Sequence, residues 1–309
     1  MQLPSSVADF IQTYPQYQIE ARHIISMPSI AVDAHEPCLF IHQLELACVS
    51  ADDPNIDMLG IDDMTTCCGV IVRHTGSFAA GAGHFDGNGT KDGLAKIVDG
   101  VVELTKDWAH KNSVNQTVLS VQYQYEVYLF GAFDDARNIS IDVVMQLLEC
   151  LYETNLDLHL KAACICANNT YYQDYIPYPC ITGLLCNVKT GRISPASFTF
   201  QGPLEEIRRL RFLMRSPIIM HSIYNPFTKI LEIEPYDWTL TNDTIQQLLG
   251  LNTNSFLHYL STSPLSEKPN YVINCKLALK FLKDNRGSLF CSGRSYKFIR
   301  TNGQWKLIE

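Results

Sequence analysis

Hairpin patterns recur along the sequence and constrain its fold more than any other feature. Residues 181–198 read ITGLLCNV, then KTG, then RISPASF, which is typical of two antiparallel strands joined by a tight turn. Residues 297–308 read KFIRTNGQWKLI and predict another hairpin at their NG turn. A third is predicted where IIMHSIY and KILEIEP flank an NP pair. Because such hairpins outnumber strand–helix–strand units, the sequence predicts an α+β fold, with mixed sheets forming a β-sandwich flanked by helices.

Apolar periodicity predicts the other elements. Apolar residues recur with helical period between Lys91 and Lys111, which predicts a long helix. Runs rich in β-branched and aromatic residues predict strands, and polar or glycine-rich stretches predict loops. The predicted strands are 44–50, 69–76, 118–133 and 156–167, and the predicted loops are 51–66, 81–93 and 168–178. Shorter helices are predicted after Ser6, after a cap at Ser140 and over 203–214. Three more are predicted between Thr241 and Asp284.

The bulk composition excludes several classes of partner. The chain has 309 residues, 46% of them hydrophobic and 18% charged, which is typical of a soluble globular protein with a substantial core. Its formal net charge is −8 and no basic stripe is visible, so neither nucleic acid nor a membrane surface is expected as a partner. With no internal repeat and no low-complexity linker, residues 1–309 are predicted to form a single domain.

The N-terminus and the cysteines predict the cellular compartment. No basic segment followed by an apolar one begins the chain, and no run of about 18 apolar residues follows. A cytoplasmic protein with reduced cysteines is therefore expected, with the nucleus as an alternative. The eleven cysteines are odd in number and include no C-x-x-C pair, which excludes a complete disulfide framework and a zinc ribbon.

Neither a metal nor another cofactor is predicted. The stretch DGNGTKD, which begins at Asp86, superficially resembles a calcium-binding loop. Lys91 stands where that loop requires glycine, and Ile97 stands where it requires glutamate. No phosphate-binding loop occurs, and no glycine-rich dinucleotide fingerprint follows a predicted strand.

Two adjacent cysteines, Cys67 and Cys68, lie where a polar loop meets an apolar strand. A catalytic cysteine must be partly exposed and close to a histidine. Cys67 fits because free backbone N–H groups at a strand end can receive a developing oxyanion. Side chains alternate along a strand, so Cys68 is expected to point to the opposite face. One of the two would then face the cleft and the other the core.

The histidine expected to serve Cys67 as a base is His84. His74 lies on the same predicted strand as Cys67, seven residues and about 23 Å further along it. His84 follows a glycine-rich segment that can return the chain to Cys67. The residues alone leave a second interpretation open, in which Cys67 is structural and His84 is a surface residue.

Five separated segments resemble one known family in order and in spacing. They are LGIDDMTTC, VRHTG, GHFDG with the GTK after it, NVKTG with the ASF after it, and LSTSPLSEKP, within a match that extends from about Leu3 to Ile308. They are similar to the protein N-terminal asparagine amidohydrolases. The resemblance implies a cysteine hydrolase fold like that of bacterial toxin and chemoreceptor deamidases.

The same resemblance implies a reaction and a partner. The reaction is hydrolysis of the side-chain amide of an N-terminal asparagine, which gives N-terminal aspartate and ammonia without a cofactor. The expected partners are polypeptides that begin with asparagine. In eukaryotes this step belongs to the N-degron pathway, in which the new N-terminal residue is arginylated and marks the polypeptide for degradation.

The resemblance also implies roles for individual residues. Cys67 takes the position of the family nucleophile and His84 that of the family histidine, whereas Cys68 departs from the family pattern. A serine is implied as the third catalytic residue and would orient the imidazole. Ser50 is the preferred candidate and Ser261 is the alternative.

Recognition of a terminal residue requires an anchor for its α-ammonium group. A carboxylate is expected, because charge-assisted hydrogen bonds are stronger than neutral ones. Asp62, Asp63 and Glu267 are the candidates, and Thr66 and Ser261 are expected beside the substrate. The backbone N–H groups around Thr66 would stabilise the oxyanion.

The second residue of the substrate also needs a place to bind. The aromatic segment Tyr236–Trp238 is expected to line such a pocket.

Two other functions remain open at this stage. The same cysteine and histidine would also suit a glutamine side-chain deamidase or a cysteine protease. A module that binds peptide N-termini without catalysis would keep the recognition residues and use Cys67 only for packing.

Overall fold

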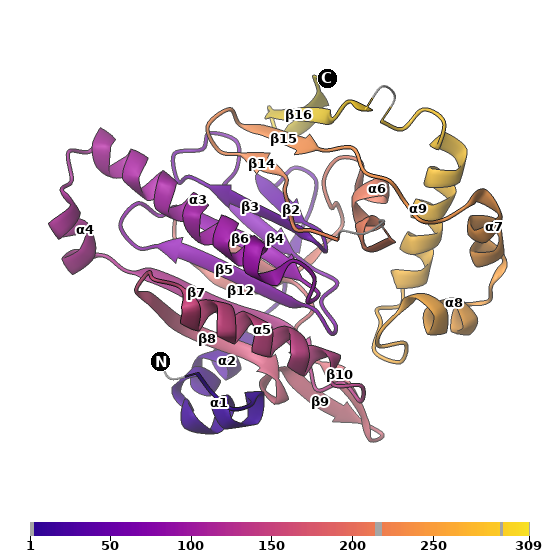
Figure 1. Ribbon diagram of the computed structural model, residues 1–309, viewed down its shortest axis with the longest axis horizontal. Helices are drawn as coiled ribbons and strands as arrows, with labels where there is room; N and C mark the ends of the chain where they lie inside the picture. Colours follow the sequence, from indigo (N-terminus) through magenta and orange to yellow (C-terminus); the bar gives the residue numbers. More distant parts are fainter. Residues whose placement is uncertain (1–2, 214–217, 291–292, 309) are drawn as a thin grey trace.

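A six-stranded sheet lies at the centre of the protein. The computed structural model describes residues 3–213, 218–290 and 293–308 (Figure 1). In this sheet the strands follow the order β13-β3-β6-β5-β7-β8, and the β3–β6, β5–β6 and β5–β7 pairs are antiparallel. The strands are β3 (Glu45–Val49), β5 (Cys68–His74), β6 (Ala80–Phe85), β7 (Tyr125–Phe133), β8 (Leu158–Cys166) and β13 (His221–Ser222).

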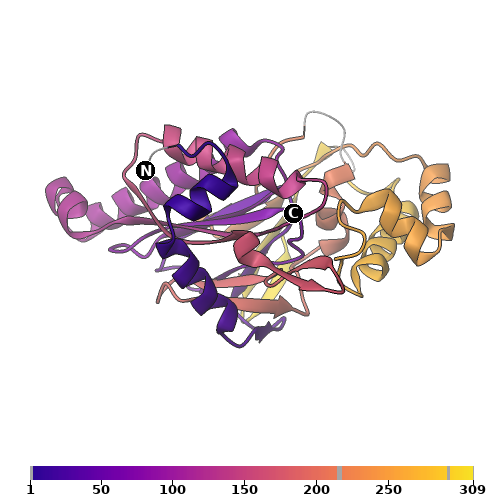
Figure 2. The same cartoon turned by 90° about the horizontal axis from the view of Figure 1, so that it is seen from below.

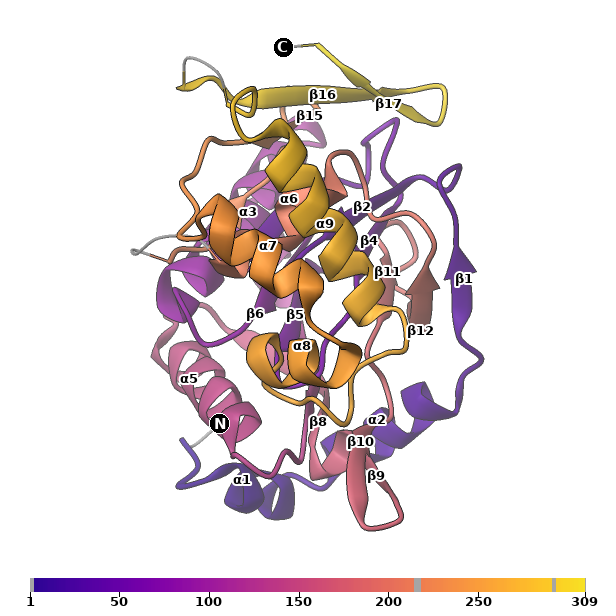
Figure 3. The same cartoon turned by 90° about the vertical axis from the view of Figure 1, so that its right-hand side faces the viewer.

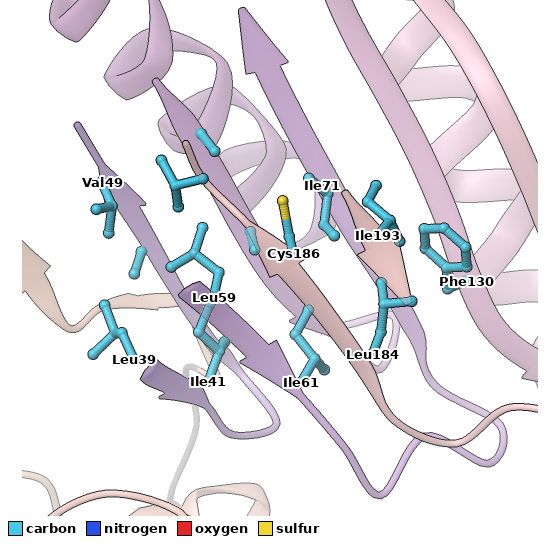
Figure 4. Packing of buried hydrophobic residues seen from close by; sticks show 14 of the residues in the cluster. Leu39, Ile41, Val49, Leu59, Ile61, Ile71, Phe130, Leu184, Cys186 and Ile193 are labelled. Atoms are coloured by element: carbon cyan, nitrogen blue, oxygen red, sulfur yellow. The ribbon is translucent and has the colours of Figure 1, made fainter. Parts of the chain in front are cut away.

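A five-stranded sheet packs against one face of the six-stranded sheet. Its order is β1-β12-β11-β4-β2. Figure 4 shows the apolar side chains between the two sheets, with Leu59, Leu184 and Cys186 facing Ile71 and Phe130. This arrangement confirms the predicted α+β fold with mixed sheets. The strands are β1 (Ile30–Val32), β2 (Cys38–Ile41), β4 (Met58–Ile61), β11 (Leu184–Asn187) and β12 (Ile193–Phe198).

Helices cover the opposite face of the six-stranded sheet. In α3 (Thr90–Lys111) the periodic residues Leu94, Ile97 and Val101 are buried against this face, together with α5 (Ile139–Glu153). Figure 2 shows these layers from the side. The helix α1 (Val7–Thr13) begins after an N-cap at Ser6, as predicted, and α2 (Gln16–Ser26) lies along β8.

A helical unit with its own apolar core lies at one end of the two sheets (Figures 1 and 3). The ion pair between Arg208 and Glu45 fastens it to the central sheet, and both side chains are fully buried. The unit contains α6 (Glu205–Arg209), the 3-10 turn η2 (Arg211–Leu213), α7 (Asn242–Gly250), α8 (Thr253–Leu260) and α9 (Tyr271–Asn285). The last three are the short helices that the sequence predicts.

The predicted hairpins are present. β11 pairs antiparallel with β12, and the C-terminal strands pair across a turn in which Asn302 and Gly303 both have positive φ, as an Asn-Gly turn requires. Two small sheets complete the fold, β9 with β10 and β14-β15-β16-β17. Their strands are β9 (Thr170–Gln173), β10 (Ile176–Pro179), β14 (Tyr224–Asn225), β15 (Ile230–Ile233), β16 (Tyr296–Thr301) and β17 (Gln304–Leu307).

Two predicted loops contain strands instead. The stretch 51–66 includes β4, and the glycine-rich stretch 81–93 includes most of β6. The glycines of β6 permit a close approach of α3. A Cβ atom on Gly81 or on Gly83 would lie 2.9 Å or 2.8 Å from side-chain carbons of Ile97. Glycine is therefore needed here for packing between a strand and a helix rather than for a turn.

Other boundaries also differ from the prediction. The predicted strand 118–133 begins only at β7, because α4 (Gln116–Gln122) precedes it. The N-cap of α5 is Asn138 rather than Ser140, which is buried inside the helix. The stretch 168–178 is a 3-10 turn, η1 (Ala167–Asn169), followed by the β9–β10 hairpin rather than a loop. Met214 of the predicted helix 203–214 lies outside the described residues, as does Cys291.

Within the described residues, no helix is long and apolar enough to cross a membrane. The ten cysteines that the structure describes are all free thiols.

Candidate active site

Strand pairing places Cys67 and His84 on one face of the six-stranded sheet. His84 on β6 lies directly across from Gly69 on β5, and Cys67 precedes Gly69 by two residues. Side chains two residues apart on a strand share a face, so Cys67 and His84 are diagonal neighbours. A Cβ atom on Gly69 would meet Met64 and Ile61, so this face looks towards the five-stranded sheet.

Cys68 points to the other face. It pairs with Phe85 and packs in the core between the six-stranded sheet and the helices, together with Leu129 and Val144. The expectation that the two adjacent cysteines face apart is therefore confirmed.

The Cys67 and His84 side chains are both nearly inaccessible, with exposed fractions of 9% and 2%. Neither ring nitrogen of His84 has a hydrogen-bond partner among the described residues. A buried imidazole without a partner is uncommon in native proteins and calls for an explanation. A polar group of a bound substrate would supply a hydrogen-bond partner for one of these ring nitrogens.

Burial favours the neutral forms of both groups. Burial raises the pKa of the Cys67 thiol well above its usual value, and the carboxylates of Asp86 and Glu267 raise it further. Burial lowers the pKa of His84 to about 4, although Asp86 opposes this shift. A neutral imidazole has a free lone pair and can act as a base, but these two pKa shifts disfavour a thiolate–imidazolium pair formed by Cys67 and His84 alone.

Asp86 belongs to this site although the sequence analysis assigned it no role there. It follows His84 by two residues, and continuing the β5–β6 register by one residue beyond Cys68 and Phe85 places it opposite Cys67, whose pKa it raises. Its carboxylate accepts hydrogen bonds from Gln43 Nε2 at 2.7 Å and from the Asn88 N–H at 2.9 Å. The two-residue spacing from His84 is a usable strand signal, but the glycine-rich composition of residues 81–93, which predicts a loop, hides it.

The segment between α8 and α9 covers the Cys67 end of the sheet (Figure 3). Thr66 Oγ1 lies 2.7 Å from Thr262 Oγ1, which joins the strand end to this segment. Glu267 accepts hydrogen bonds from the hydroxyl groups of Ser261 and Ser263. Burial raises the pKa of Glu267 to about 7. In the described part of the chain, no cationic side chain lies within ion-pair distance of Glu267.

Asp62 and Asp63 are already neutralised by cations. The Lys268 ammonium contacts Asp62 and lies 3.3 Å from Asp63, and Arg209 pairs with Asp63 at 2.9 Å. Burial alone would raise the pKa of Asp63, but Lys268 and Arg209 lower it to about 2. Burial and the neighbouring Asp63 raise the pKa of Asp62. Glu267 is therefore the carboxylate of the three that still lacks a cation.

The structure does not bring Ser50, the expected third catalytic residue, close to His84. Val49 pairs with Ala80, so Ser50 lies at the opposite end of β3 from the position that faces His84. At about 3.4 Å per residue the separation is about 17 Å. The Ser50 hydroxyl contacts Asp52 instead. Ser261 lies in the α8–α9 segment, but its hydroxyl donates to Glu267 and not to His84.

The residue that faces His84 from β3 is Glu45. The β3–β6 register ends at Leu46 and Gly83, and continuing it by one residue brings Glu45 opposite His84; the Leu44 N–H donates to the His84 carbonyl at 3.0 Å. Glu45 is fully buried and pairs with Arg208 at 2.7 Å and with Arg211 at 3.3 Å. Burial alone would raise the pKa of Glu45, but the two arginines lower it to about 2. A single charged residue within the apolar run LELACVS was the signal that pointed to this network.

The aromatic segment Tyr236–Trp238 lines a real cavity, but far from Cys67. This cavity of about 630 Å³ is also lined by Arg286 and Phe290, which follow the C-terminal end of α9. Tyr271 opens α9 at the end near Cys67. Fifteen residues of helix separate the two ends by about 22 Å. The expected pocket for the second substrate residue is therefore not at this position.

Comparison with known proteins agrees with the sequence pattern. A family model described as protein N-terminal asparagine amidohydrolase matches residues 28–307. Proteins of that name from Homo sapiens and Mus musculus are 32% and 33% identical over 313 residues, which cover 100% of this chain and 96% of each relative. A protein of the same name from Arabidopsis thaliana is 25% identical over 260 residues, 76% of this chain and 70% of its own length.

Proposed function

Because this chain belongs to the protein N-terminal asparagine amidohydrolase family, we propose that it hydrolyses the side-chain amide of an N-terminal asparagine. The products are an N-terminal aspartate and ammonia. The observation that carries the proposal is the shared face of Cys67 and His84 beneath a segment that presents Glu267. In a eukaryotic cytoplasm this product would mark the polypeptide for degradation.

The first step forms a thioester. The neutral His84 accepts the Cys67 proton, and the thiolate attacks the carboxamide carbon of asparagine. The amide oxygen gains the negative charge in the tetrahedral intermediate. Among the described residues, no backbone group accepts a hydrogen bond from the Cys67 N–H, so it is available to this oxygen. One such donor contributes about 3 kcal/mol.

The second step returns the enzyme to its starting state. The imidazolium donates its proton to the leaving nitrogen, and ammonia departs as the C–N bond breaks. His84 then takes a proton from water, whose oxygen attacks the thioester carbon. The C–S bond breaks, the sulfur regains a proton from the imidazolium, and aspartate is released.

Asp86 supports the charged stage of this cycle. Its carboxylate acts on both Cys67 and His84, and it favours the imidazolium over the thiolate. The proposed ion pair therefore forms only transiently. Among the described residues, no hydroxyl group is hydrogen-bonded to a ring nitrogen of His84. We therefore favour Asp86 over Ser50 as the group that assists the imidazole.

Glu267 is the proposed anchor of the substrate α-ammonium. It is partly buried near Cys67 and has hydroxyl partners, and no cationic side chain among the described residues forms an ion pair with it. The α-ammonium of the substrate supplies the missing positive charge. Within a polypeptide, only the first residue has an α-ammonium, so an asparagine further along the chain cannot form this ion pair. Thr66 and Ser261 are proposed to flank the bound residue, while Asp63 pairs with Lys268 and Arg209 and so leaves these cations unavailable to Glu267.

A peptide series distinguishes this function from its alternatives. The purified protein is incubated with matched peptides that begin with Asn, begin with Gln, or carry Asn at an internal position. We expect ammonia release and a deamidation mass shift from the first peptide alone. Ammonia from the Gln peptide alone would indicate a glutamine deamidase, and a cleaved backbone would indicate a protease. Binding without any product would indicate a recognition module.

A further inference from the structure

The sequence stretch NNTYYQDYIPY forms a hairpin whose tyrosines the proposed reaction does not use. β9 and β10 pair antiparallel across a two-residue turn of Asp174 and Tyr175. Tyr175 is 99% exposed, and Tyr171 and Tyr172 are 48% and 62% exposed. Large aromatic rings at such exposure are typical of contact surfaces, because they offer apolar area at little conformational cost.

The tip of this hairpin holds an unusual backbone conformation. Asp174 and Tyr175 both have positive φ, at 49° and 65°. This type of turn strongly prefers Asn-Gly or Asp-Gly, and a bulky residue in the left-handed region is an outlier. The chain therefore keeps a tyrosine where glycine would fit without strain. Such outliers cluster at functional positions that hold ligands.

The hairpin is joined to the Cys67 segment through direct contacts. The Ala132 N–H donates to the Cys67 carbonyl at 2.7 Å, and two residues later the Asp134 N–H donates to Thr170 Oγ1 at 2.8 Å. Tyr172 OH donates to the Asp134 carboxylate at 3.0 Å, which fixes the hairpin on the same segment. The hairpin therefore begins beside the end of the strand that carries the candidate nucleophile.

The hairpin also touches the segment that covers the site. Ser266 Oγ, one residue before the proposed α-ammonium anchor, donates to the Pro177 carbonyl at 2.9 Å. The rings of Tyr171 and Tyr178 stack with centroids 5.6 Å apart, which gives the hairpin a rigid aromatic face. Figure 1 shows β9 and β10 extending from the same end of the sheets as α8. The hairpin and the α8–α9 segment thus border the site together.

We propose that the tyrosines of the β9–β10 hairpin bind the polypeptide chain that follows the N-terminal asparagine of the substrate. The proposal rests on the proposed function, since it takes the reacting residue to lie at Cys67. An extended chain advances about 3.3 Å per residue, so residues several positions after the asparagine reach the hairpin. Stacking and apolar contact with tyrosine tolerate many side chains, which suits an enzyme that recognises only the first residue closely.

The test compares peptides of two lengths on variants of the full chain. Tyr175→Gly removes the ring, and glycine accepts the positive φ, so folding is preserved. Tyr152→Ala is the matched control, since Tyr152 is 54% exposed at the C-terminal end of α5. The substrates are a tripeptide and a decapeptide that share the same Asn-initiated sequence.

We expect Tyr175→Gly to raise KM for the decapeptide about tenfold and to leave the tripeptide kinetics unchanged. Tyr152→Ala should change neither. Equal decapeptide KM for Tyr175→Gly and wild type overturns the hairpin proposal and leaves the proposed function intact.

Binding to an inactive background separates this proposal from the reaction itself. A fluorescent decapeptide is titrated into Cys67→Ala with and without Tyr175→Gly, and its anisotropy is followed. An affinity about tenfold weaker in the double variant supports the hairpin surface even if no ammonia is ever released. If the two variants bind the decapeptide with equal affinity, the hairpin proposal is wrong, whether or not the wild-type protein releases ammonia.

Discussion

His84 lies one diagonal step from Cys67 across the β5–β6 strand pair, and both side chains share the face from which Cys68 is excluded. Which of the two cysteines lies beside His84 is determined by the register of the β5–β6 pair. A slip of one residue would exchange the two thiols, placing Cys68 beside the imidazole and Cys67 in the helix-facing core.

The first prediction follows from this register. Cys67→Ala should abolish ammonia release from an Asn-initiated peptide, because Cys67 is the proposed nucleophile and shares a face of the strand pair with His84. Cys68→Ala is the neighbouring control and should keep kcat/KM near the wild-type value while it lowers the midpoint of urea unfolding. Ammonia release by Cys67→Ala would remove Cys67 as the nucleophile.

The second prediction concerns His84 and the pH dependence of stability. Burial lowers the pKa of His84 from 6.5 to about 4, so the unfolded chain binds a proton in this range and the folded chain does not. Stability is therefore lost as pH falls from about 6.5 to about 4, by up to about 3 kcal/mol. Urea unfolding over this pH range should show this slope in wild type and a smaller slope in His84→Gln.

A histidine at the surface provides the control for that measurement. His23 on α2 is exposed, so His23→Gln should keep the wild-type slope. A His84→Gln slope identical to wild type would show that the buried imidazole is not the source.

The third prediction concerns the pH profile of catalysis. Burial raises the pKa of Glu267 to about 7, and the proposed anchor must be ionised to bind an ammonium. kcat/KM should therefore fall below about pH 7, and also above about pH 8, where the substrate α-amino group loses its proton. Glu267→Gln should lower kcat/KM by about ten- to a hundredfold and lose the acidic limb.

The stability of the same variant gives an independent check. Because the folded pKa of Glu267 exceeds the ordinary value of 4.5, this group costs stability as pH rises from about 4.5 to 7. Glu267→Gln should remove that cost. Glu153→Gln, at an exposed ion pair with Lys91, is the matched control and should change neither profile. An unchanged acidic limb in Glu267→Gln would contradict the anchor role.

The fourth prediction concerns Gly183, which precedes β11. A Cβ atom there would lie 2.2 Å from the Ala196 carbonyl oxygen and 2.6 Å from Asp62 Oδ1. Gly183→Ala should cost about 1–3 kcal/mol of unfolding free energy, and it should also lower activity by displacing Asp62. Gly250→Ala is the control, since nothing lies within 4 Å of that position at the end of α7. It should be neutral or stabilising by up to about 1 kcal/mol.

Local sequence patterns predict the elements that are determined by neighbouring residues, such as hairpin turns. The hairpins were found because their turn residues have a specific backbone requirement, as Asn302 and Gly303 show. β6 was missed because its glycines weaken every local strand signal. Their purpose appears only when α3 is placed against them, with Ile97 in contact with Gly81. A short-range pattern cannot report a packing requirement set by a helix that follows in the chain.

The candidate site shows the same limit. Alternation along one strand was enough to separate Cys67 from Cys68. Sequence proximity, in contrast, could not show that Ser50 lies at the far end of β3 from His84. Glu45 and Arg208 lie 163 residues apart, so no local spacing joins them. The roles of Cys67, His84 and Glu267 remain predictions that the experiments above address.

The hydroxyl contact between Thr66 and Thr262 spans 196 residues of chain. During synthesis, the ribosome must therefore add nearly two hundred residues after the strand end at Thr66 before its cover exists. At about 5–20 residues per second this takes about 10 to 40 s. A nascent or prematurely terminated chain would carry the thiol and the imidazole without the anchor. With Glu267 as the proposed anchor, the order of synthesis would withhold activity until the last third of the chain has left the ribosome and docked.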